Sequence, residues 1–281
     1  MTGAVLWLDG RLVAADEARV SPFDHGLLVG DGVFETLRVY DGVPFAWTRH
    51  HERLVRSAAG LGLTAPGSQE LRTAVDDVLA ANGLTEGRVR LTVTGGPSPL
   101  GSERGDSPPT VIVMGAPATR WPPTVDVVIV PWSRNERGAV AGLKTTSYAE
   151  NVRALAYARE HEAGEAMFLN TRGELCEATG SNVFVVRDGV VLTPPADAGC
   201  LLGVTRALVL ELCTDHGMPS EEAALGPAAL GDADEAFLTS STREVQPIGR
   251  VDGHALPAAP GPTSDKVGAL LTELIARVPD P

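Results

Sequence analysis

Several residue types are scarce in this 281-residue chain, and each shortage excludes a class of protein. Its three cysteines, Cys176, Cys200 and Cys213, lack metal-ligand spacing, so we expect buried, reduced thiols in a cytoplasmic protein and no metal site. No apolar run approaches the roughly 20 residues that cross a bilayer. Residues 1–9 have neither the basic start nor the long apolar stretch of a secretory signal. A disulfide-rich, membrane-spanning or secreted protein is therefore not expected.

Positive charge is also scarce. The chain has 23 Lys and Arg against 36 Asp and Glu, a formal net charge of −13. An acidic surface repels nucleic acid and anionic membranes, so neither is expected as a partner. A phosphate-bearing ligand would have to be bound locally, by backbone N–H groups and a few arginines. Only two of the basic residues are lysines, Lys144 and Lys266.

The hydrophobic pattern restarts once along the chain. Asp-Gly pairs after residues 5–8 and 33–40 indicate hairpins. Residues 116–123 contain three prolines and predict a linker between a smaller domain, 1–115, and a larger one, 124–281. Because helices and strands do not alternate regularly, the fold class is α+β. We predict helices at 48–61, 70–81, 148–162, 204–216 and 264–278, and strands at 5–8, 33–40, 43–47, 88–94, 110–114, 125–130, 165–170, 182–186, 190–193 and 236–240.

The segment around Lys144 has an unusual composition. An apolar residue, Leu143, precedes the lysine, and a cluster of hydroxyl residues follows it at 145–148. Burial lowers the pKa of a lysine, and the neutral amine that results is a nucleophile. A snorkelling surface lysine is the alternative interpretation of this segment alone.

Six segments together resemble the signature of one family. They are residues 30–38 (GDGVFETLR), 50–54 (HHERL), 142–148 (GLKTTSY), 177–184 (EATGSNVF), 203–206 (GVTR) and 240–247 (SSTREVQP). In this order they resemble the fold-type IV enzymes that use pyridoxal 5′-phosphate (PLP). The family includes branched-chain, D-amino acid and (R)-amine aminotransferases and aminodeoxychorismate lyases. The resemblance implies a two-domain, D-amino acid aminotransferase-like fold, with a mostly antiparallel sheet or barrel and helices in each domain. The PLP lysine is expected in the C-terminal domain.

The resemblance also implies three catalytic residues. Lys144 would form the Schiff base with PLP and carry the proton between the substrate and the cofactor. Glu177, 177 − 144 = 33 residues later, would pair with the pyridine nitrogen and keep the ring protonated. Tyr148 would hydrogen-bond the ring hydroxyl, or is a core tyrosine.

The remaining implied PLP contacts are to its phosphate. Arg53 matches the arginine that grips the phosphate in the family, and a guanidinium suits bidentate contact. Further donors are expected at the start of a helix, where N–H groups are unpaired, and in the segment at 240–247. These donors are Gly203, Val204, Thr205, Ser241 and Thr242.

The substrate side departs from the known patterns. D-amino acid aminotransferases have Arg and His in the loop at 95–105, where we align Leu100 and Ser102 instead. A small-molecule amino donor and a 2-oxo acid would be bound there, and the family implies a homodimer that completes each site. The candidate substrate residues are Phe34, Thr36, Arg90, Arg104 and Arg134, the last three for the carboxylate or for salt bridges.

Two activities and one non-catalytic role follow as interpretations. The first is transamination between an amino acid, including D-amino acids, or a primary amine and a 2-oxo acid. The second is an aminodeoxychorismate lyase that eliminates pyruvate and gives 4-aminobenzoate, because Thr36 is typical of that group. A PLP-binding protein without catalysis is the alternative of another class.

Overall fold

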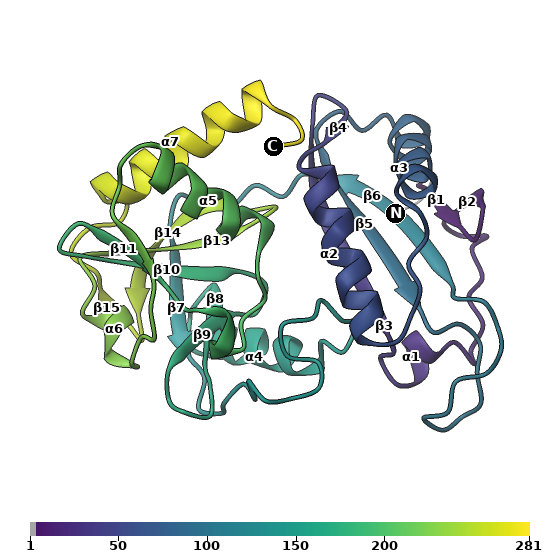
Figure 1. Cartoon of the computed structure of the whole chain (residues 1–281), viewed down its shortest axis with the longest axis horizontal. Helices are drawn as coiled ribbons and strands as arrows, with labels where there is room; N and C mark the ends of the chain where they lie inside the picture. The colour runs from purple at the N-terminus through teal and green to yellow at the C-terminus, as the bar shows by residue number, and fades with distance from the viewer. Residues whose placement is uncertain (1–3) are drawn as a thin grey trace. The chain divides into compact units, whose positions relative to one another are not determined.

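The structure is a computed structural model, and it describes residues 4–281. The chain forms two compact units (Figure 1). The first comprises residues 4–119 with Leu143–Tyr148 and Pro279–Pro281, and the second comprises Arg120–Gly142 and Ala149–Val278.

The first unit is built on an antiparallel sheet of six strands in the order β2-β1-β6-β5-β3-β4. Asp-Gly turns connect β1 to β2 and β3 to β4, and both aspartates adopt positive φ. Asp tolerates this left-handed conformation better than most residues, and Gly adopts it freely. The strands are β1 (Val5–Leu8), β2 (Arg11–Ala14), β3 (Gly32–Tyr40), β4 (Val43–Pro44), β5 (Gly87–Thr94) and β6 (Val111–Pro117).

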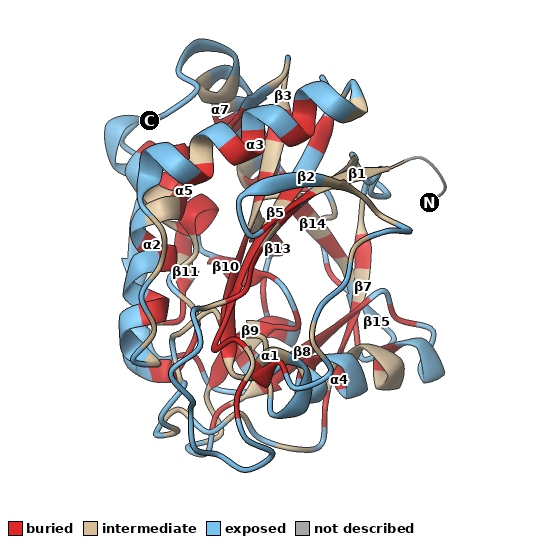
Figure 2. Ribbon diagram, turned by 90° about the vertical axis from the view of Figure 1, so that its right-hand side faces the viewer, coloured by how far each residue is buried: buried red, intermediate tan, exposed pale blue. Residues whose placement is uncertain are grey.

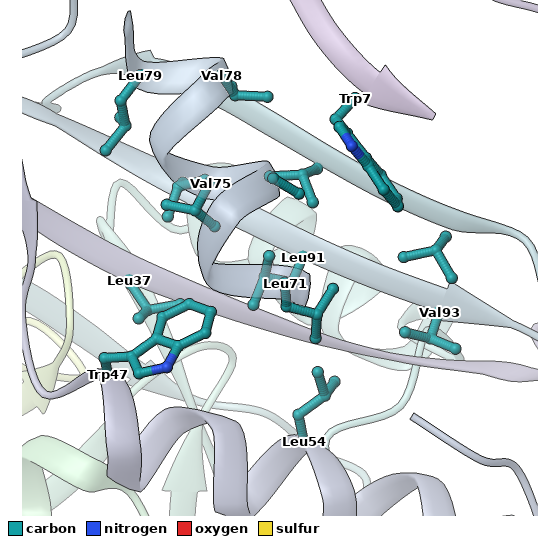
Figure 3. Packing of buried hydrophobic residues seen from close by; sticks show 14 of the residues in the cluster. Trp7, Leu37, Trp47, Leu54, Leu71, Val75, Val78, Leu79, Leu91 and Val93 are labelled. Carbon is teal, nitrogen blue, oxygen red and sulfur yellow. The ribbon is translucent and has the colours of Figure 1, made fainter. Parts of the chain in front are cut away.

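Two helices, α2 (Trp47–Gly60) and α3 (Ser68–Asn82), pack on one face of this sheet (Figure 3). Successive side chains of a strand point to opposite faces of the sheet. Val33, Leu37 and Val39 of β3 therefore point into the core between the sheet and the two helices. Leu54 of α2 and Leu71 of α3 meet these residues and are fully buried. Phe34 and Thr36 therefore belong to the opposite face of β3. A short helix, α1 (His25–Leu28), precedes β3.

The second unit contains a mixed sheet of nine strands, with the main order β12-β11-β10-β13-β14-β7-β8-β9 and β15 paired to β14. The strands are β7 (Val125–Ile129), β8 (Glu165–Leu169), β9 (Leu175–Ala178), β10 (Asn182–Arg187), β11 (Val190–Thr193), β12 (Ser220–Glu222), β13 (Glu235–Ser240), β14 (Glu244–Val251) and β15 (His254–Ala255). The helices are α4 (Ala149–Glu160), α5 (Val204–Asp215), α6 (Ala228–Gly231) and α7 (Pro262–Arg277), with a 3-10 turn at Ala196–Ala198.

In Figure 2 the buried positions, drawn in red, gather along the strands, whereas the helices carry long exposed stretches in pale blue. In the second unit, β10 and β13 are buried along nearly their whole length. Val183 and Val185 point to one core cluster. Phe184 and Val186 point to another cluster, which Val209 of α5 and Val267 of α7 complete. Because both faces of these strands are covered, their middle positions, 183–186 and 236–238, are all apolar.

The predicted fold class is confirmed, as are the main helices and strands within a few residues. The longest strand that the sequence did not predict is β14, which contains Pro247 and Gly249 and has an irregular register between Ile248 and Arg250. Proline and glycine are usually signs of turns, and a β-bulge is one of the places where a strand tolerates them.

The proposed domain boundary stays a prediction, although β6 extends to Pro117, inside the expected linker. The segment Leu143–Tyr148 lies in the first compact unit, whereas we expected the lysine in the C-terminal domain. Backbone hydrogen bonds between this segment and β3 are the physical reason. Within residues 4–281 no helix is long and apolar enough to span a membrane, and no cluster of His, Cys, Asp and Glu could hold a metal ion.

Candidate active site

The lysine segment is bound to the start of β3 through its backbone. Phe34 N–H donates to Lys144 O at 3.0 Å, and Thr146 N–H donates to Gly32 O at 2.8 Å. Val33 and Thr145 form an antiparallel bridge between these two bonds. Lys144 N–H also donates to Ser57 Oγ of α2 at 3.1 Å. These bonds fix the main chain of Lys144 on both sides of its Cα.

Glycines allow the segment to come this close. A Cβ at Gly60 of α2 would lie 2.7 Å from Leu143 Cδ1, and one at Gly32 would lie 3.0 Å from Thr146 Oγ1. Gly30 adopts φ +70°, and a Cβ there would lie 2.8 Å from Ser147 Oγ. Its carbonyl accepts hydrogen bonds from the hydroxyls of Thr146 and Ser147. Side chains at these glycines would push the lysine segment away from β3 and α2.

The ring of Phe34 is the centre of the group around the lysine amine. Lys144 Nζ lies 4.6 Å from the ring centroid and Arg90 Cζ lies 3.7 Å from it. The ring of Tyr148 meets it edge-on at 5.1 Å. Burial lowers the pKa of Arg90, which Tyr148 partly offsets. An aromatic face attracts cations, so this ring can hold an amine and a guanidinium near each other.

Thr36 lies on the same face of β3 as Phe34, because residues two apart in a strand share a face. It is the ladder partner of Arg90 on β5. The first unit thus brings together Phe34, Thr36, Arg90, Lys144 and Tyr148, all of which the sequence proposed.

Arg104 is placed differently from the other candidates. Its Nε donates to Asp31 at 2.7 Å, and its Nη1 donates to the carbonyl of Gly62 at 3.1 Å. The hydrogen bond to Arg104 is also what lowers the pKa of Asp31 most. The Arg104 side chain therefore connects the loop at 95–107 to the turn before β3.

Arg53 lies on the core face of β3, where it pairs with Glu35. Arg53 Nε and Nη2 donate to the two carboxylate oxygens at 2.7 and 2.8 Å, and His50 Nδ1 lies 2.7 Å from Glu35 Oε2. Glu35 is fully buried. Burial opposes its charge, but Arg53 and His50 together hold its pKa far below the usual value. Burial lowers the pKa of His50, and Glu35 opposes that shift.

In the second unit, Glu177 is held from two directions. Leu201 N–H donates to its Oε2 at 3.0 Å, and Arg134 Nη1 lies 3.5 Å from its Oε1. Arg134 in turn donates to Asn151 Oδ1 at 3.1 Å and lies over the ring of Phe168. Arg134, proposed for substrate, is thus found beside Glu177.

The start of α5 joins the same group. Asn182, the first residue of β10, donates from Nδ2 to Leu201 O at 2.7 Å. A Cβ at Gly203 would lie 2.1 Å from Asn182 Oδ1, so only glycine fits there. Gly203 is the N-cap of α5 and provides no side-chain cap, which leaves Val204 and Thr205 at an uncapped helix start.

The hairpin between β13 and β14 carries the last two candidates, Ser241 and Thr242. Thr239, two residues before Ser241, pairs with Asn182 in the sheet. Asn182 therefore connects this hairpin, the start of α5 and, through Leu201, the carboxylate of Glu177. The second unit brings together the Glu177, Gly203–Thr205 and Ser241–Thr242 elements that the sequence proposed.

These residues fit PLP on three counts. A carboxylate is available for a protonated ring nitrogen, and an uncapped helix start is available for a phosphate. In addition, the hydroxyls of Ser181 and Thr239 are buried and have no hydrogen-bond partner within residues 4–281. Buried polar groups normally have partners, so unpaired hydroxyls beside Asn182 suit a polar ligand.

Two residues of this arrangement were not predicted from the sequence. Glu35 is a charged residue at a position where the two-residue period of β3 requires an apolar one, and that exception was the available signal. Asn182 reads as the ordinary first residue of a strand. Its connecting role depends on a loop 19 residues later, which no local pattern shows.

Comparison with known proteins agrees with the geometry. The family model of amino-transferase class IV matches residues 32–251. The chain is 32% identical over 281 residues to the D-alanine aminotransferase of Bacillus licheniformis, and the match covers 95% of each chain.

Two solved structures are similar to this chain. One is a branched-chain amino acid aminotransferase from T.th., complexed with N-(5′-phosphopyridoxyl)-L-glutamate, with a TM-score of 0.92 and 27% identity over 100% of this chain and 97% of that one. The other is a Legionella pneumophila protein named provisionally as a 4-amino-4-deoxychorismate lyase, with a TM-score of 0.88 and 26% identity over 92% and 96%. The predicted family, cofactor and type of enzyme are confirmed, and the chain belongs to the class IV aminotransferases, which are PLP-dependent enzymes.

Proposed function

We propose that Lys144 is the residue that holds PLP and moves the proton during transamination. The observation that supports this is the fixed main chain of Lys144, with its Nζ 4.6 Å from the Phe34 ring centroid. Like charges repel, and the Arg90 guanidinium lies against the same ring, so it acts against a second positive charge at Nζ. The neutral amine is the form that would accept a proton from the substrate Cα.

Glu177 and the start of α5 are proposed to orient the cofactor. PLP supplies the ring that withdraws electrons from the substrate. Glu177 would keep the ring nitrogen protonated, with its own position fixed by Leu201 N–H and Arg134. Val204, Thr205, Ser241 and Thr242 would donate to the phosphate. Arg53, whose Nε and Nη2 donate to Glu35, remains the arginine proposed as a phosphate ligand. Tyr148 would hydrogen-bond the ring hydroxyl.

Arg90 is the proposed carboxylate-binding residue of the substrate pocket. Its guanidinium lies on the Phe34 ring, opposite Thr36 in the ladder and within the group that contains Lys144. A carboxylate near Arg90 suits an amino acid donor and a 2-oxo acid acceptor. Arg104 is instead paired with Asp31, so we propose that it holds the loop at 95–107 in place.

We propose a cytoplasmic homodimer as the complete enzyme. The first unit exposes apolar side chains around α1 and the neighbouring loop: Phe23, Leu27, Val29 and Leu100. Leu27 and Leu100 are 69% and 73% exposed, and a group of exposed apolar side chains suits a surface that a partner covers. The buried thiols of Cys176 and Cys200 suit a reducing compartment.

A lyase that eliminates pyruvate is the second candidate. Thr36 is the residue that suggests it, and Thr36 lies on the same face of β3 as Phe34, opposite Arg90 in the ladder. Both activities would use the same lysine, so these residues do not separate them.

A half-reaction separates the two activities. The PLP-loaded enzyme is mixed with D-alanine, L-leucine, L-glutamate or (R)-1-phenylethylamine, and the visible absorbance of the lysine-linked cofactor is followed. We expect loss of this band with at least one donor, with formation of aminated cofactor. An unchanged band with all donors, together with pyruvate release from aminodeoxychorismate, would identify the lyase instead.

A further inference from the structure

A buried ion pair in the second unit lies outside the residues assigned above. Glu165 Oε2 and Arg243 Nη2 are 3.0 Å apart, and both side chains are less than a tenth exposed. The carboxylate is on β8, whereas the guanidinium comes from the hairpin that carries Ser241 and Thr242. Breaking such a pair is costly because the remaining charge stays buried.

The other oxygen of Glu165 holds the loop that follows Glu177. Glu165 Oε1 accepts hydrogen bonds from the hydroxyl of Thr179 and from Thr179 N–H, the latter at 3.3 Å. The carbonyl of Thr179 accepts a bond from Asn151 Nδ2, and Asn151 Oδ1 accepts one from Arg134. The N–H, the C=O and the hydroxyl of Thr179 are thus all held, two residues after Glu177.

Arg243 has contacts on its other side as well. Its Nη1 donates to Gln246 Oε1, and its guanidinium lies 3.8 Å from the centroid of the Trp121 ring. The side chain of Gln246 donates to Pro122 O at 2.8 Å. The backbone N–H of Arg243 donates to Ser240 Oγ at 3.1 Å. The hairpin tip is therefore fixed around this one side chain.

We propose that the Glu165–Arg243 pair is a positioning device that couples the Glu177 loop to the Ser241–Thr242 hairpin. Each of its two charged groups holds a different cofactor-binding element, and the ion pair joins them. A shift of one element is transmitted to the other through Glu165, because both oxygens of one carboxylate are used. Glu165, Thr179 and Arg243 act through their neighbours and are positioning residues. The inference rests on the proposed roles of Glu177 and of the hairpin.

The most selective test removes one hydroxyl. Thr179→Val keeps the shape of the side chain but deletes the donor to Glu165, and Thr179→Ser restores it. Thr193→Val is the matched control, because Thr193 is also buried and its hydroxyl donates to Val183 O within the same sheet. Arg243→Met removes the pair from the other side.

Two measurements are made on each variant. Amide hydrogen exchange of the PLP-free protein should become at least tenfold faster in both 178–182 and 240–246 for Thr179→Val and Arg243→Met. PLP titration should show at least tenfold weaker binding for the same two variants. Thr179→Ser and Thr193→Val should match the parent protein in both segments and in affinity.

Two results would overturn the coupling. One is faster exchange in 178–182 alone after Thr179→Val, with 240–246 unchanged. The other is a Thr193→Val variant that loses PLP affinity as strongly as Thr179→Val does. Failure of the proposed function looks different: PLP would then not be attached to Lys144 in the parent protein, whatever the exchange pattern.

Discussion

Removing the charge of Glu35 should destabilise the first unit more than almost any other single polar change. Glu35→Gln keeps the size of the side chain but leaves the Arg53 guanidinium without its bidentate partner in a site where Arg53 is 5% exposed. Breaking a buried pair in this way costs about 3–5 kcal/mol. With a urea slope of about 2 kcal/mol/M, the midpoint of unfolding should fall by about 1.5–2.5 M.

The assay is urea unfolding of the PLP-free protein, followed by tryptophan fluorescence. Trp47 of the first unit lies in the same core cluster as Leu54 of α2 and reports on this unit. The control is Asp76→Asn, which breaks the exposed Arg72–Asp76 pair and should cost less than about 0.5 kcal/mol. Combining Glu35→Gln with Arg53→Met should recover part of the loss, because no unpaired charge then remains. A Glu35→Gln midpoint equal to that of Asp76→Asn would refute this reasoning.

The pH dependence of the same variant has a definite sign. The pKa of Glu35 in the folded protein lies below its ordinary value of 4.5. The ionised Glu35 therefore contributes fully to the free energy of unfolding above pH 4.5, and this contribution is lost as the pH falls towards the folded pKa. The difference in free energy of unfolding between the parent protein and Glu35→Gln should therefore become smaller below pH 4.5. A difference that becomes larger on acidification would contradict a lowered pKa of Glu35 in the folded protein.

Three further changes test other parts of the account. Gly203→Ala places a Cβ 2.1 Å from Asn182 Oδ1 and should weaken PLP binding at least tenfold, about 1.4 kcal/mol, in an apoprotein titration, whereas Gly226→Ala, with open space around it, should bind normally. Arg90→Met should raise KM for the 2-oxo acid at least tenfold with PLP affinity unchanged, and an unchanged KM would exclude Arg90 as the carboxylate ligand. Burial raises the pKa of Cys176 and Cys200, the latter to about 12, so iodoacetamide at pH 7.5 should leave both unmodified until the protein unfolds, as peptide mass spectrometry can show.

Local patterns in the sequence were enough to predict most of the fold. The two-residue alternation of β3 and the helical spacing of α2 and α3 are strong because each element buries one face. Strand β14 was missed because its Pro247 and Gly249 are typical of turns, and a bulge accommodates them. The shortest elements, such as β15 and α6, are too brief to leave a periodic pattern.

The candidate site was predicted residue by residue, but not its connections. Motifs identified Lys144 and Glu177, since each lies in a recognisable local segment. They did not show that Arg104 pairs with Asp31 or that Arg134 pairs with Glu177, because partners 73 and 43 residues apart are set by tertiary structure. The same holds for the Glu165–Arg243 pair, whose members are 78 residues apart.

The most direct test of the central claim uses the scarcity of lysine in this chain. The PLP-loaded protein is reduced with borohydride, which fixes the cofactor to its amine, and the digested peptides are analysed by mass spectrometry. The account predicts a phosphopyridoxyl group on Lys144 and none on Lys266, the other lysine of the chain. Attachment at Lys266, or no attachment to either lysine, would contradict it.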